Sequence, residues 1–336
     1  MKIAVIGTGA IGGTVAALAD RAGHDVSVTA RGAQLDALRD TGLHLTGQWG
    51  DHLARPHASA QLDEKPELAV LAVKAQDAGS ALDENAGFLD GVPLVVVQNG
   101  LGGAEAAAAR LPGTPVIGAL ALYAASYLSP GEVEITTAAT TYLGRLADTP
   151  DDDFATAVET FASFMPTETT VNFTGAQWTK LIVNQINALP AITGLSVQRS
   201  ITDPRLRRVL TASMREAVMV ARASGVRFEP LLGLSDGLLL AFEWAPPRLA
   251  RLLPGAMAKR MGSTPNPGST LQSIRRGQLT EIDHLNGAVV EAAARVKVTA
   301  PLNAALVALV HRVEREGAFI PPSVVVRQLS RLLDAR

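Results

Sequence analysis

The sequence predicts an α/β domain with a parallel sheet, followed by an all-helical domain. Three observations support this prediction. Short, continuous apolar runs alternate with alanine-rich helical stretches through the first half of the chain. After about residue 172, apolar residues recur three and four positions apart and strand-like runs become scarce. The length of 336 residues suits two domains, which we place at residues 1–172 and 173–336.

The strands of the first domain are predicted from short β-rich runs, of which Leu68–Val73 and Pro93–Val97 are apolar throughout. Such strands are buried on both faces, as in a doubly wound sheet that helices cover on each side. The runs are Lys2–Ile6, Asp25–Thr29, Leu68–Val73, Pro93–Val97 and, more weakly, Pro115–Ala119. A helix is predicted at Thr14–Ala22. Residues Gly131–Leu143 alternate and hold many threonines, which predicts an antiparallel hairpin at the end of the sheet.

The second domain is predicted to be helical from Trp178 onward. Long helices are expected at Leu206–Ala223, Thr280–Val296 and Pro301–Glu316, with Thr299 as the N-cap of the last. Residues 226–268 are rich in proline and glycine, so we expect short helices joined by stiff turns there. The apolar helical faces suit either a core or a homodimer interface, and the sequence leaves that choice open.

Composition excludes several classes of protein. The chain has no cysteine, which excludes disulfide scaffolds and thiolate metal sites and suits a reducing cytoplasm. The net charge is −2 and aromatic residues make up 4%, so we expect no nucleic-acid partner. No stretch of about 18 apolar residues predicts a membrane span. Glycines 7, 9, 12 and 13 interrupt the uncharged stretch Ile3–Ala19, so we expect no secretion signal.

A glycine-rich motif follows the first predicted strand. The sequence Gly7-Thr8-Gly9-Ala10-Ile11-Gly12 has the form G-x-G-x-x-G and opens the first helix. In this context the first glycine permits a tight turn, the second lets the backbone approach a pyrophosphate, and the third allows the helix to pack closely on the strand. The helix N-terminus offers N–H groups to the phosphates. We therefore predict a dinucleotide site; the alternative is a glycine-rich turn without a ligand.

Arg31 follows the second predicted strand, where NAD sites usually carry an acidic residue. A guanidinium pairs with a ribose 2′-phosphate that a carboxylate would repel, so we expect NADP(H) as the cofactor. The alternative is that Arg31 stacks on the adenine or faces water. Lys74 and Asn99 follow two later strands. Because ligands bind beyond the carboxyl ends of parallel strands, we expect these side chains to line one crevice.

A polar stripe marks the first helix of the second domain. Lys180, Asn184 and Asn187 lie within roughly 60° of one another on one helical face. A polar stripe on an apolar helix needs a partner, water or a ligand, although an exposed helix face explains the same pattern. Glu281 is expected in the first turn of a later helix, where a carboxylate is favourable. His284 is read as a surface residue, and we expect no metal site.

These motifs together resemble the ketopantoate reductase (2-dehydropantoate 2-reductase) family over almost the full chain. The matching segments are GTGAIG at 7–12, Lys74, QNG at 98–100, KLIVNQINALPAITG at 180–194, STLQSIRRGQLTEIDHLNG at 269–287 and VTAPLNAALVAL at 298–309. The resemblance implies a Rossmann-type domain and a helical C-terminal domain like that of 6-phosphogluconate dehydrogenase. It also implies NADPH-dependent reduction of 2-dehydropantoate to pantoate, a step of pantothenate and coenzyme A biosynthesis.

The resemblance assigns a role to each matched residue. It implies that Lys180 protonates the carbonyl oxygen and that Glu281 helps to position and charge that centre. Substrate binding is implied for Asn99, Asn184, Asn187 and Ser269. Cofactor contacts are implied for Gly7–Gly12, Arg31, Lys74 and Asn99. Burial would lower the pKa of the lysine and Glu281 would raise it, and the sequence leaves that balance open.

The chain departs from the family pattern in its substrate half. The second asparagine, Asn187, stands seven residues after Lys180, where the family commonly has eight. Ser273 replaces a common aspartate, and residues 226–268 are longer and richer in proline than expected. An alternative is therefore a reductase of the same fold that acts on a different 2-oxo acid or an imine. A third hypothesis is an NADP(H)-binding sensor without catalysis.

Overall fold

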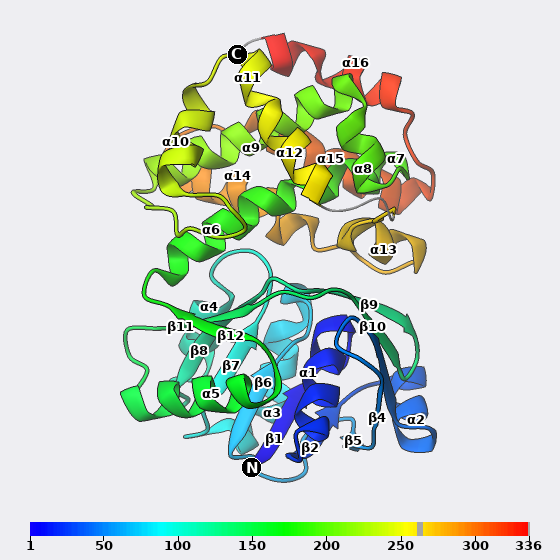
Figure 1. Ribbon diagram of the computed structural model, residues 1–336, viewed down its shortest axis with the longest axis vertical. Coiled ribbons are helices and arrows are strands. Elements are labelled where there is room, and N and C mark those ends of the chain that lie inside the picture. The colour runs from blue at the N-terminus through cyan, green and yellow to red at the C-terminus, as the bar shows by residue number, and fades with distance from the viewer. Residues whose placement is uncertain (261–264, 335–336) are drawn as a thin grey trace. The chain divides into compact units, whose positions relative to one another are not determined.

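The computed structural model describes residues 1–260 and 265–334, and within them the chain forms two compact units. The first unit spans Met1–Phe173 and the second spans Thr174–Arg336. Figure 1 shows strands and helices in the first unit and helices throughout the second. The predicted fold class, an α/β region followed by a helical region, is confirmed.

The first unit alternates strands with helices along the chain. Its strands are β1 (Lys2–Ile6), β2 (Asp25–Thr29), β3 (Leu43–Gly47), β4 (His52–Ala54), β5 (His57–Ser59), β6 (Leu68–Leu71), β7 (Leu94–Val97), β8 (Val116–Ala121), β9 (Ala124–Ser129), β10 (Glu132–Thr137), β11 (Thr141–Arg145) and β12 (Thr167–Thr170). Its helices are α1 (Ala10–Arg21), α2 (Gly32–Asp40), the 3-10 turn η1 (Ala75–Asp77), α3 (Ala78–Leu89), α4 (Gly103–Arg110) and α5 (Asp151–Phe164).

The larger sheet has the order β12-β11-β8-β7-β6-β1-β2-β5. The strands from β8 to β5 in this order run parallel, while β11 pairs antiparallel with β8. The chain goes from β1 to β2 on one side and continues with β6 on the other, so the strand order reverses beside β1. Ligands of open α/β sheets bind outside the carboxyl ends of the strands at such a reversal.

Alternate residues of β1 enter different cores. Ile3 and Val5 pack with residues of α1 and α5, while Ala4 and Ile6 pack with residues of α3 and α4. Burial of each large apolar side chain contributes about 1.5–3 kcal/mol, so both faces of the strand stabilise the sheet. This arrangement explains why the strand reads as a continuous apolar run.

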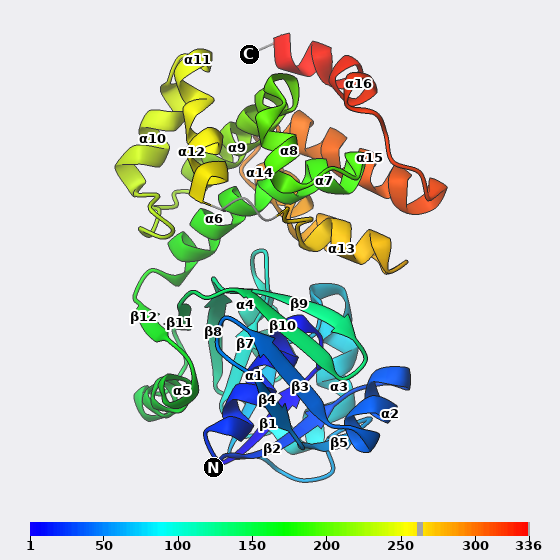
Figure 2. The same cartoon turned by 45° about the vertical axis from the view of Figure 1, so that its right-hand side comes forward.

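A smaller sheet with the order β4-β3-β10-β9 covers the outer side of α1 (Figure 2). The predicted hairpin at 131–143 is wrong in its bounds and its place. The antiparallel pair is β9 with β10, and β10 pairs in parallel with β3, whereas β11 joins the larger sheet. Helix α1 approaches β10 closely, because a Cβ on Gly13 would lie 2.9 Å from Cγ1 of Val133.

The second unit is built from helices. They are α6 (Phe173–Asn184, which starts at the last residue of the first unit), η2 (Gln185–Asn187), α7 (Ala188–Thr193), α8 (Val197–Thr202), α9 (Pro204–Ala223), α10 (Asp236–Trp244), α11 (Pro247–Ala250), α12 (Leu252–Arg260), α13 (Ser269–Arg275), η3 (Ile282–His284), α14 (Asn286–Arg295), α15 (Pro301–Glu316) and α16 (Pro322–Asp334). Helix α9 packs against α8, α10, α12, α14, α15 and α16 and forms the centre of this unit. Among the residues that the structure describes, no helix has the length and apolar character that a membrane crossing requires.

Several predicted helix starts are wrong. Helix α1 begins at Ala10 rather than Thr14, and α9 begins at Pro204 rather than Leu206. The helix expected from Thr280 begins only at Asn286, because Leu285, with φ −106° and ψ −92°, separates it from the 3-10 turn η3. The N-cap of α15 is Ala300 rather than Thr299, since Pro301 occupies the first helical position and restricts the residue before it. Short helices α10, α11 and α12 follow the prediction for residues 226–268; residues 261–264 lie outside the described part of the chain.

Candidate active site

The three glycines of the motif differ in the space that a side chain would have at each position. Gly7 has φ +94°, and a Cβ there would lie 2.4 Å from Cγ1 of Val73. A Cβ on Gly12 would lie 1.9 Å from the carbonyl oxygen of Gly7, so the helix packs against the turn that precedes it. A Cβ on Gly9 would meet no described heavy atom within 4 Å. Gly7 and Gly12 are therefore required by packing, while Gly9 leaves open space beside the backbone.

The N-terminus of α1 is shaped for an anion. Gly9 is the N-cap, and within the described residues no side chain caps this end of the helix. Thr8 is buried and Ala10 and Ile11 form the first turn. Gly7 N–H donates to Thr29 Oγ1 at 3.1 Å, which holds the loop against the end of β2. The uncapped turn, its dipole and the space at Gly9 fit the pyrophosphate of a dinucleotide.

The ends of three neighbouring strands lie close together at this loop. Gln98 follows β7, and its amide donates to the carbonyl oxygen of Val73 at 3.0 Å. Val73 follows β6 and limits the space at Gly7, which follows β1. The half-buried Lys74 and Asn99 come directly after Val73 and Gln98. Lys74, Asn99 and the glycine loop therefore follow three neighbouring strands at one edge of the sheet, and the crevice expected between their side chains stays a prediction.

Arg31 stands at the end of β2, as predicted, and is the N-cap residue of α2. Its guanidinium forms an ion pair with the carboxylate of Glu84 on α3. The Arg31 side chain is 67% exposed and that of Glu84 is 31% exposed. Sequence reasoning missed Glu84, because no local pattern indicates a partner 53 residues away.

Lys180 lies on α6 in the second unit and is partly buried. The helix is held by its buried neighbours Trp178, Leu181 and Ile182. Burial lowers the pKa of Lys180 to about 8, and the charge of Glu281 opposes that shift without cancelling it. The structure thus answers the question that the sequence left open: desolvation outweighs the carboxylate. An ammonium with a pKa near 8 can donate a proton at neutral pH.

The polar stripe of α6 is shorter than the sequence predicts. The α-helix ends at Asn184, and Asn187 lies in the 3-10 turn η2, so the single helical face expected for all three residues is wrong. Asn184 is half-buried, whereas Asn187 is buried. A Cβ on Gly268 would lie 2.6 Å from Oδ1 of Asn187, which brings Asn187 next to the residue that precedes Ser269. Ser269 is exposed and begins α13.

A buried polar cluster surrounds the turn after Asn184. The amide nitrogen of Asn286 donates to Gln185 Oε1 at 2.7 Å and to Asn303 Oδ1 at 2.8 Å. Ser213 Oγ lies 3.0 Å from Gln185 Oε1, and Asn303 Nδ2 donates to Glu216 at 2.7 Å. These contacts join η2 to α9, α14 and α15, so the change from α-helix to 3-10 turn has fixed partners in the core.

Glu281 is held by contacts on either side of it. Thr280 N–H donates to Glu314 Oε1 on α15 at 2.9 Å, and Asp283 Oδ1 lies 2.9 Å from Nε2 of His311. The other ring nitrogen of His311 lies 2.7 Å from Glu314 Oε2. Since carboxylates only accept, both contacts are hydrogen bonds only when the imidazole is protonated, so together they favour the charged ring. The segment that carries Glu281 is therefore anchored to α15.

The same contacts shift the pKa values of His311 and Glu314 in opposite directions. Burial lowers the pKa of His311, but hydrogen bonds to Asp283 and Glu314 outweigh burial and raise it above its ordinary value. Burial raises the pKa of Glu314, but the N–H of Thr280 and the His311 ring outweigh burial and lower it. His284, read from the sequence as a surface residue, is half-buried in η3.

Comparison with known proteins finds similar sequences over most of the chain. The family described as ketopantoate reductase PanE/ApbA matches residues 3–148, and its C-terminal counterpart, ketopantoate reductase PanE/ApbA C terminal, matches residues 172–314. The 2-dehydropantoate 2-reductase of Pyrococcus horikoshii is 29% identical over 319 residues, which cover 94% of this chain and 99% of the relative.

Solved structures show the same similarity. A PanE/ApbA family ketopantoate reductase from Ralstonia eutropha JMP134 is 30% identical, with a TM-score of 0.77 over 94% of this chain and 99% of that chain. D-mandelate dehydrogenase in a ternary structure with NADH and anilino(oxo)acetate has a TM-score of 0.79 over the same shares, at 18% identity. At 18% identity, the similarity to D-mandelate dehydrogenase shows a shared fold alone.

Proposed function

Because this chain belongs to the ketopantoate reductase family, we propose that it reduces 2-dehydropantoate to pantoate with NADPH, with Lys180 as the general acid. The reaction would supply pantoate for pantothenate and coenzyme A biosynthesis. The observation that carries the chemical part of the proposal is the partly buried Lys180, with its pKa lowered to about 8 beside Glu281. The relatives named 2-dehydropantoate 2-reductase support the choice of substrate.

The residues at the sheet edge fit a nicotinamide dinucleotide. The open backbone at Gly9 and the uncapped start of α1 would hold the pyrophosphate, and the loop Gly7–Gly12 supplies the N–H groups. Arg31 would pair with the 2′-phosphate of NADPH, and Lys74 and Asn99 would contact the cofactor beyond β6 and β7. When bound, the reduced cofactor supplies a hydride.

Lys180 would complete the reduction by donating a proton to the negatively charged oxygen that develops on the substrate. As the carbonyl carbon gains a hydride, the carbonyl oxygen becomes an alkoxide and takes a proton from the Lys180 ammonium. The hydride and proton together convert the ketone into an alcohol. The lysine is left neutral and regains its proton from solvent. Glu281 favours the protonated lysine, because its charge raises the pKa that burial lowers.

Four polar side chains are assigned to the substrate. We assign substrate binding to Asn99, Asn184, Asn187 and Ser269. Amide and hydroxyl groups suit a ligand with a carboxylate and a hydroxyl, because each can donate to one and accept from the other. The burial of Asn187 against Gly268 gives this residue a fixed position, so its shift along the sequence leaves it beside α13.

The test is NADPH oxidation followed at 340 nm with purified protein. The panel contains 2-dehydropantoate, bulkier 2-oxo acids and cyclic imines, each with NADPH and with NADH. We expect the highest kcat/KM with 2-dehydropantoate and NADPH. A clear preference for another 2-oxo acid or an imine would keep the reductase and overturn the substrate. Cofactor binding without turnover on any member of the panel would favour the non-catalytic sensor.

A further inference from the structure

We propose that Glu84 sets the cofactor preference of this protein by competing with the ribose 2′-phosphate for Arg31. The inference rests on the proposed use of NADPH and adds a residue to it. Glu84 holds the guanidinium in an ion pair at the end of β2, where the 2′-substituent of a dinucleotide is read. In this position a carboxylate weakens the binding of NADPH and leaves the binding of NADH nearly unchanged.

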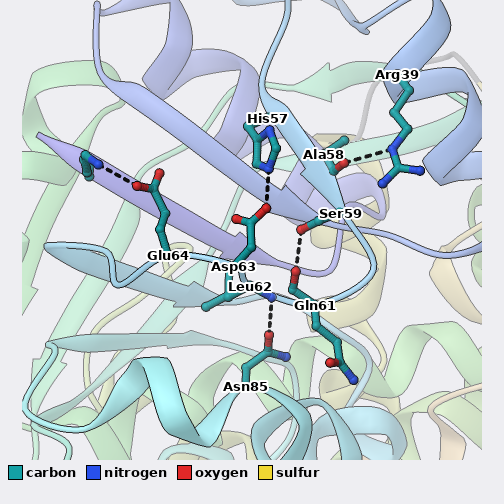
Figure 3. A network of polar contacts seen from close by, with 10 residues as sticks. Arg39, His57, Ala58, Ser59, Gln61, Leu62, Asp63, Glu64 and Asn85 are labelled. Carbon is teal, nitrogen blue, oxygen red and sulfur yellow. Dashed lines mark hydrogen bonds and ion pairs between the residues drawn. The ribbon is translucent and has the colours of Figure 1, made fainter.

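The backbones that carry the two residues are tied together by one short segment. Ala30, directly before Arg31, donates its N–H to the carbonyl oxygen of Ser59 at 3.0 Å. Asn85, directly after Glu84, is buried and accepts the N–H of Leu62 at 2.7 Å. Residues 59–62 thus connect the end of β2 to the middle of α3 (Figure 3). The positions of Arg31 and Glu84 along their elements are consequently fixed relative to each other.

Further contacts anchor this segment on both sides. Figure 3 shows His57 directed at Asp63, with Nε2 2.6 Å from Oδ2, and Arg39 donating to the carbonyl oxygen of Ala58 at 3.0 Å. Glu64 pairs with Lys2 at the start of β1, at 2.5 Å. The backbone segment that links β2 to α3 is therefore held at several points. A change in the pairing of Arg31 involves rotation of side chains and leaves this backbone segment in place.

The exposure of the pair makes it exchangeable. An ion pair between exposed side chains contributes little free energy, because water solvates both partners well. A phosphate monoester carries a charge of about −1.5 to −2 at pH 7 and accepts two hydrogen bonds from a guanidinium, so it is the stronger partner. The carboxylate of Glu84 is thus displaced by a 2′-phosphate rather than excluding it.

Glu84 opposes the phosphate in two ways. Arg31 must give up a carboxylate partner before it gains the phosphate, and the displaced carboxylate then repels the phosphate from close by. Neither cost arises for NADH, whose 2′-hydroxyl is neutral and can donate to a carboxylate. The preference for NADPH is therefore smaller than Arg31 alone would produce.

The test compares Glu84→Gln with Asp83→Asn. Asp83 is the adjacent residue of α3 and pairs with Arg110 instead, so its substitution removes the same charge without touching Arg31. Dissociation constants of NADPH and NADH are measured by fluorescence titration at low salt for the wild type, both variants, Arg31→Ala and the double variant Arg31→Ala/Glu84→Gln. Inhibition by 2′,5′-ADP and by 5′-ADP reports the 2′-phosphate separately.

We expect Glu84→Gln to tighten NADPH and 2′,5′-ADP by about three- to ten-fold and to change NADH and 5′-ADP by less than about twofold. Asp83→Asn should change neither, and the gain should vanish in the Arg31→Ala background. An equal gain in Asp83→Asn, or a gain that survives without Arg31, would assign the effect to net charge and overturn the proposal.

Failure of this inference is distinguishable from failure of the proposed function. An unchanged NADPH affinity in Glu84→Gln, with wild-type turnover intact, would reject Glu84 and keep the reductase. A selective NADPH gain in Glu84→Gln, in a protein that turns over no 2-oxo acid, would keep Glu84 and reject the reductase. If the wild type bound neither dinucleotide, the inference would fall together with the cofactor on which it rests.

Discussion

Two cation–glutamate pairs in this molecule have the same charges and different surroundings. Arg31 and Glu84 form an ion pair in the first unit with the arginine mostly in water. In the second unit Lys180 is partly buried and the charge of Glu281 acts on it. The comparison teaches that exposure decides what a charged partner can change. The exposed arginine can exchange its partner, whereas at the partly buried lysine the nearby carboxylate changes how firmly a proton is held.

The two cations suit these tasks by their chemistry. A guanidinium stays charged at any pH that the protein survives, so Arg31 can change only its partner. An ammonium loses its proton more readily as it is desolvated, so burial gives Lys180 a pKa of about 8. An arginine in place of Lys180 would therefore hold its proton too firmly to act as the proposed acid.

The largest effect is expected at Lys180. Lys180→Ala removes the proton donor and should lower kcat by about 10²- to 10⁴-fold. Lys180→Arg keeps the positive charge but holds its proton too firmly, so it should restore little activity. The measurement is steady-state reduction of 2-dehydropantoate, with Lys259→Ala on α12 as an exposed-lysine control. Near-wild-type turnover in Lys180→Arg would show that charge alone suffices and would remove the distinction between the pairs.

The pH dependence of the reaction gives the next effect. Activity that needs protonated Lys180 should fall as pH rises through about 8. Glu281→Gln removes the charge that raises this pKa, so the alkaline limb of kcat/KM should move to lower pH by about half a unit to one unit. Glu281→Asp, which keeps the charge, should shift the limb less. A limb that stays in place or moves upward would contradict the proposed coupling.

A smaller effect is expected from the anchor of the Glu281 segment. The raised pKa of His311 means that its stabilisation is complete below its ordinary value of 6.5 and is lost as pH rises through the folded value. The lowered pKa of Glu314 means that its stabilisation is present above 4.5 and is lost as pH falls through the folded value. The contributions of His311 and Glu314 to the free energy of unfolding are therefore both present between about pH 4.5 and 6.5.

His311→Gln should lower the Tm by about 1–3 °C near pH 5.5, because the ring is about one-third exposed and solvent screens its ion pairs. The difference from the wild type should shrink at pH 9, where the wild-type ring has also lost its charge. Thermal unfolding at both pH values measures this. An equal difference at both would indicate a packing role for the imidazole instead of a charged one.

We expect the smallest effect from added salt, which also distinguishes most directly between the Arg31–Glu84 pair and the pair of Lys180 and Glu281. Raising ionic strength from about 0.02 M to about 0.5 M screens exposed charges strongly and partly buried ones weakly. The ratio of NADPH to NADH affinity should fall several-fold, while the alkaline limb set by Lys180 should move by less than about 0.2 pH unit. Comparable sensitivity of both readouts would mean that the two pairs are equally solvated.

The parts of the fold that the sequence predicts well are those with strong local patterns. The runs at β6 and β7 are apolar throughout because both faces are buried, and these strands, like β1 and β2, lie where expected. The smaller sheet was missed, because β3 and β4 are short and mix polar with apolar residues. Its pairing of β10 with β3 joins segments about 90 residues apart, and no local spacing indicates such a contact.

The candidate site shows the same division. The sequence predicts where the glycine loop, Arg31 and Lys180 lie, because a motif or a place after a strand or on a helix marks each position. The sequence does not predict that α6 ends at Asn184. This end coincides with a buried polar cluster whose members come from three other helices. Glu84 contacts Arg31, and Gly268 lies against Asn187, only after folding.

Helix α1 has sheet on both of its sides, and this affects how its amide protons exchange with solvent. Residues from Val15 to Ala19 are buried, so their exchange requires a sheet to separate from the helix. The opening free energy of this helix therefore approaches that of unfolding the first unit. A ligand at its N-terminus meets a turn that is already ordered, so little binding energy is used to order the backbone.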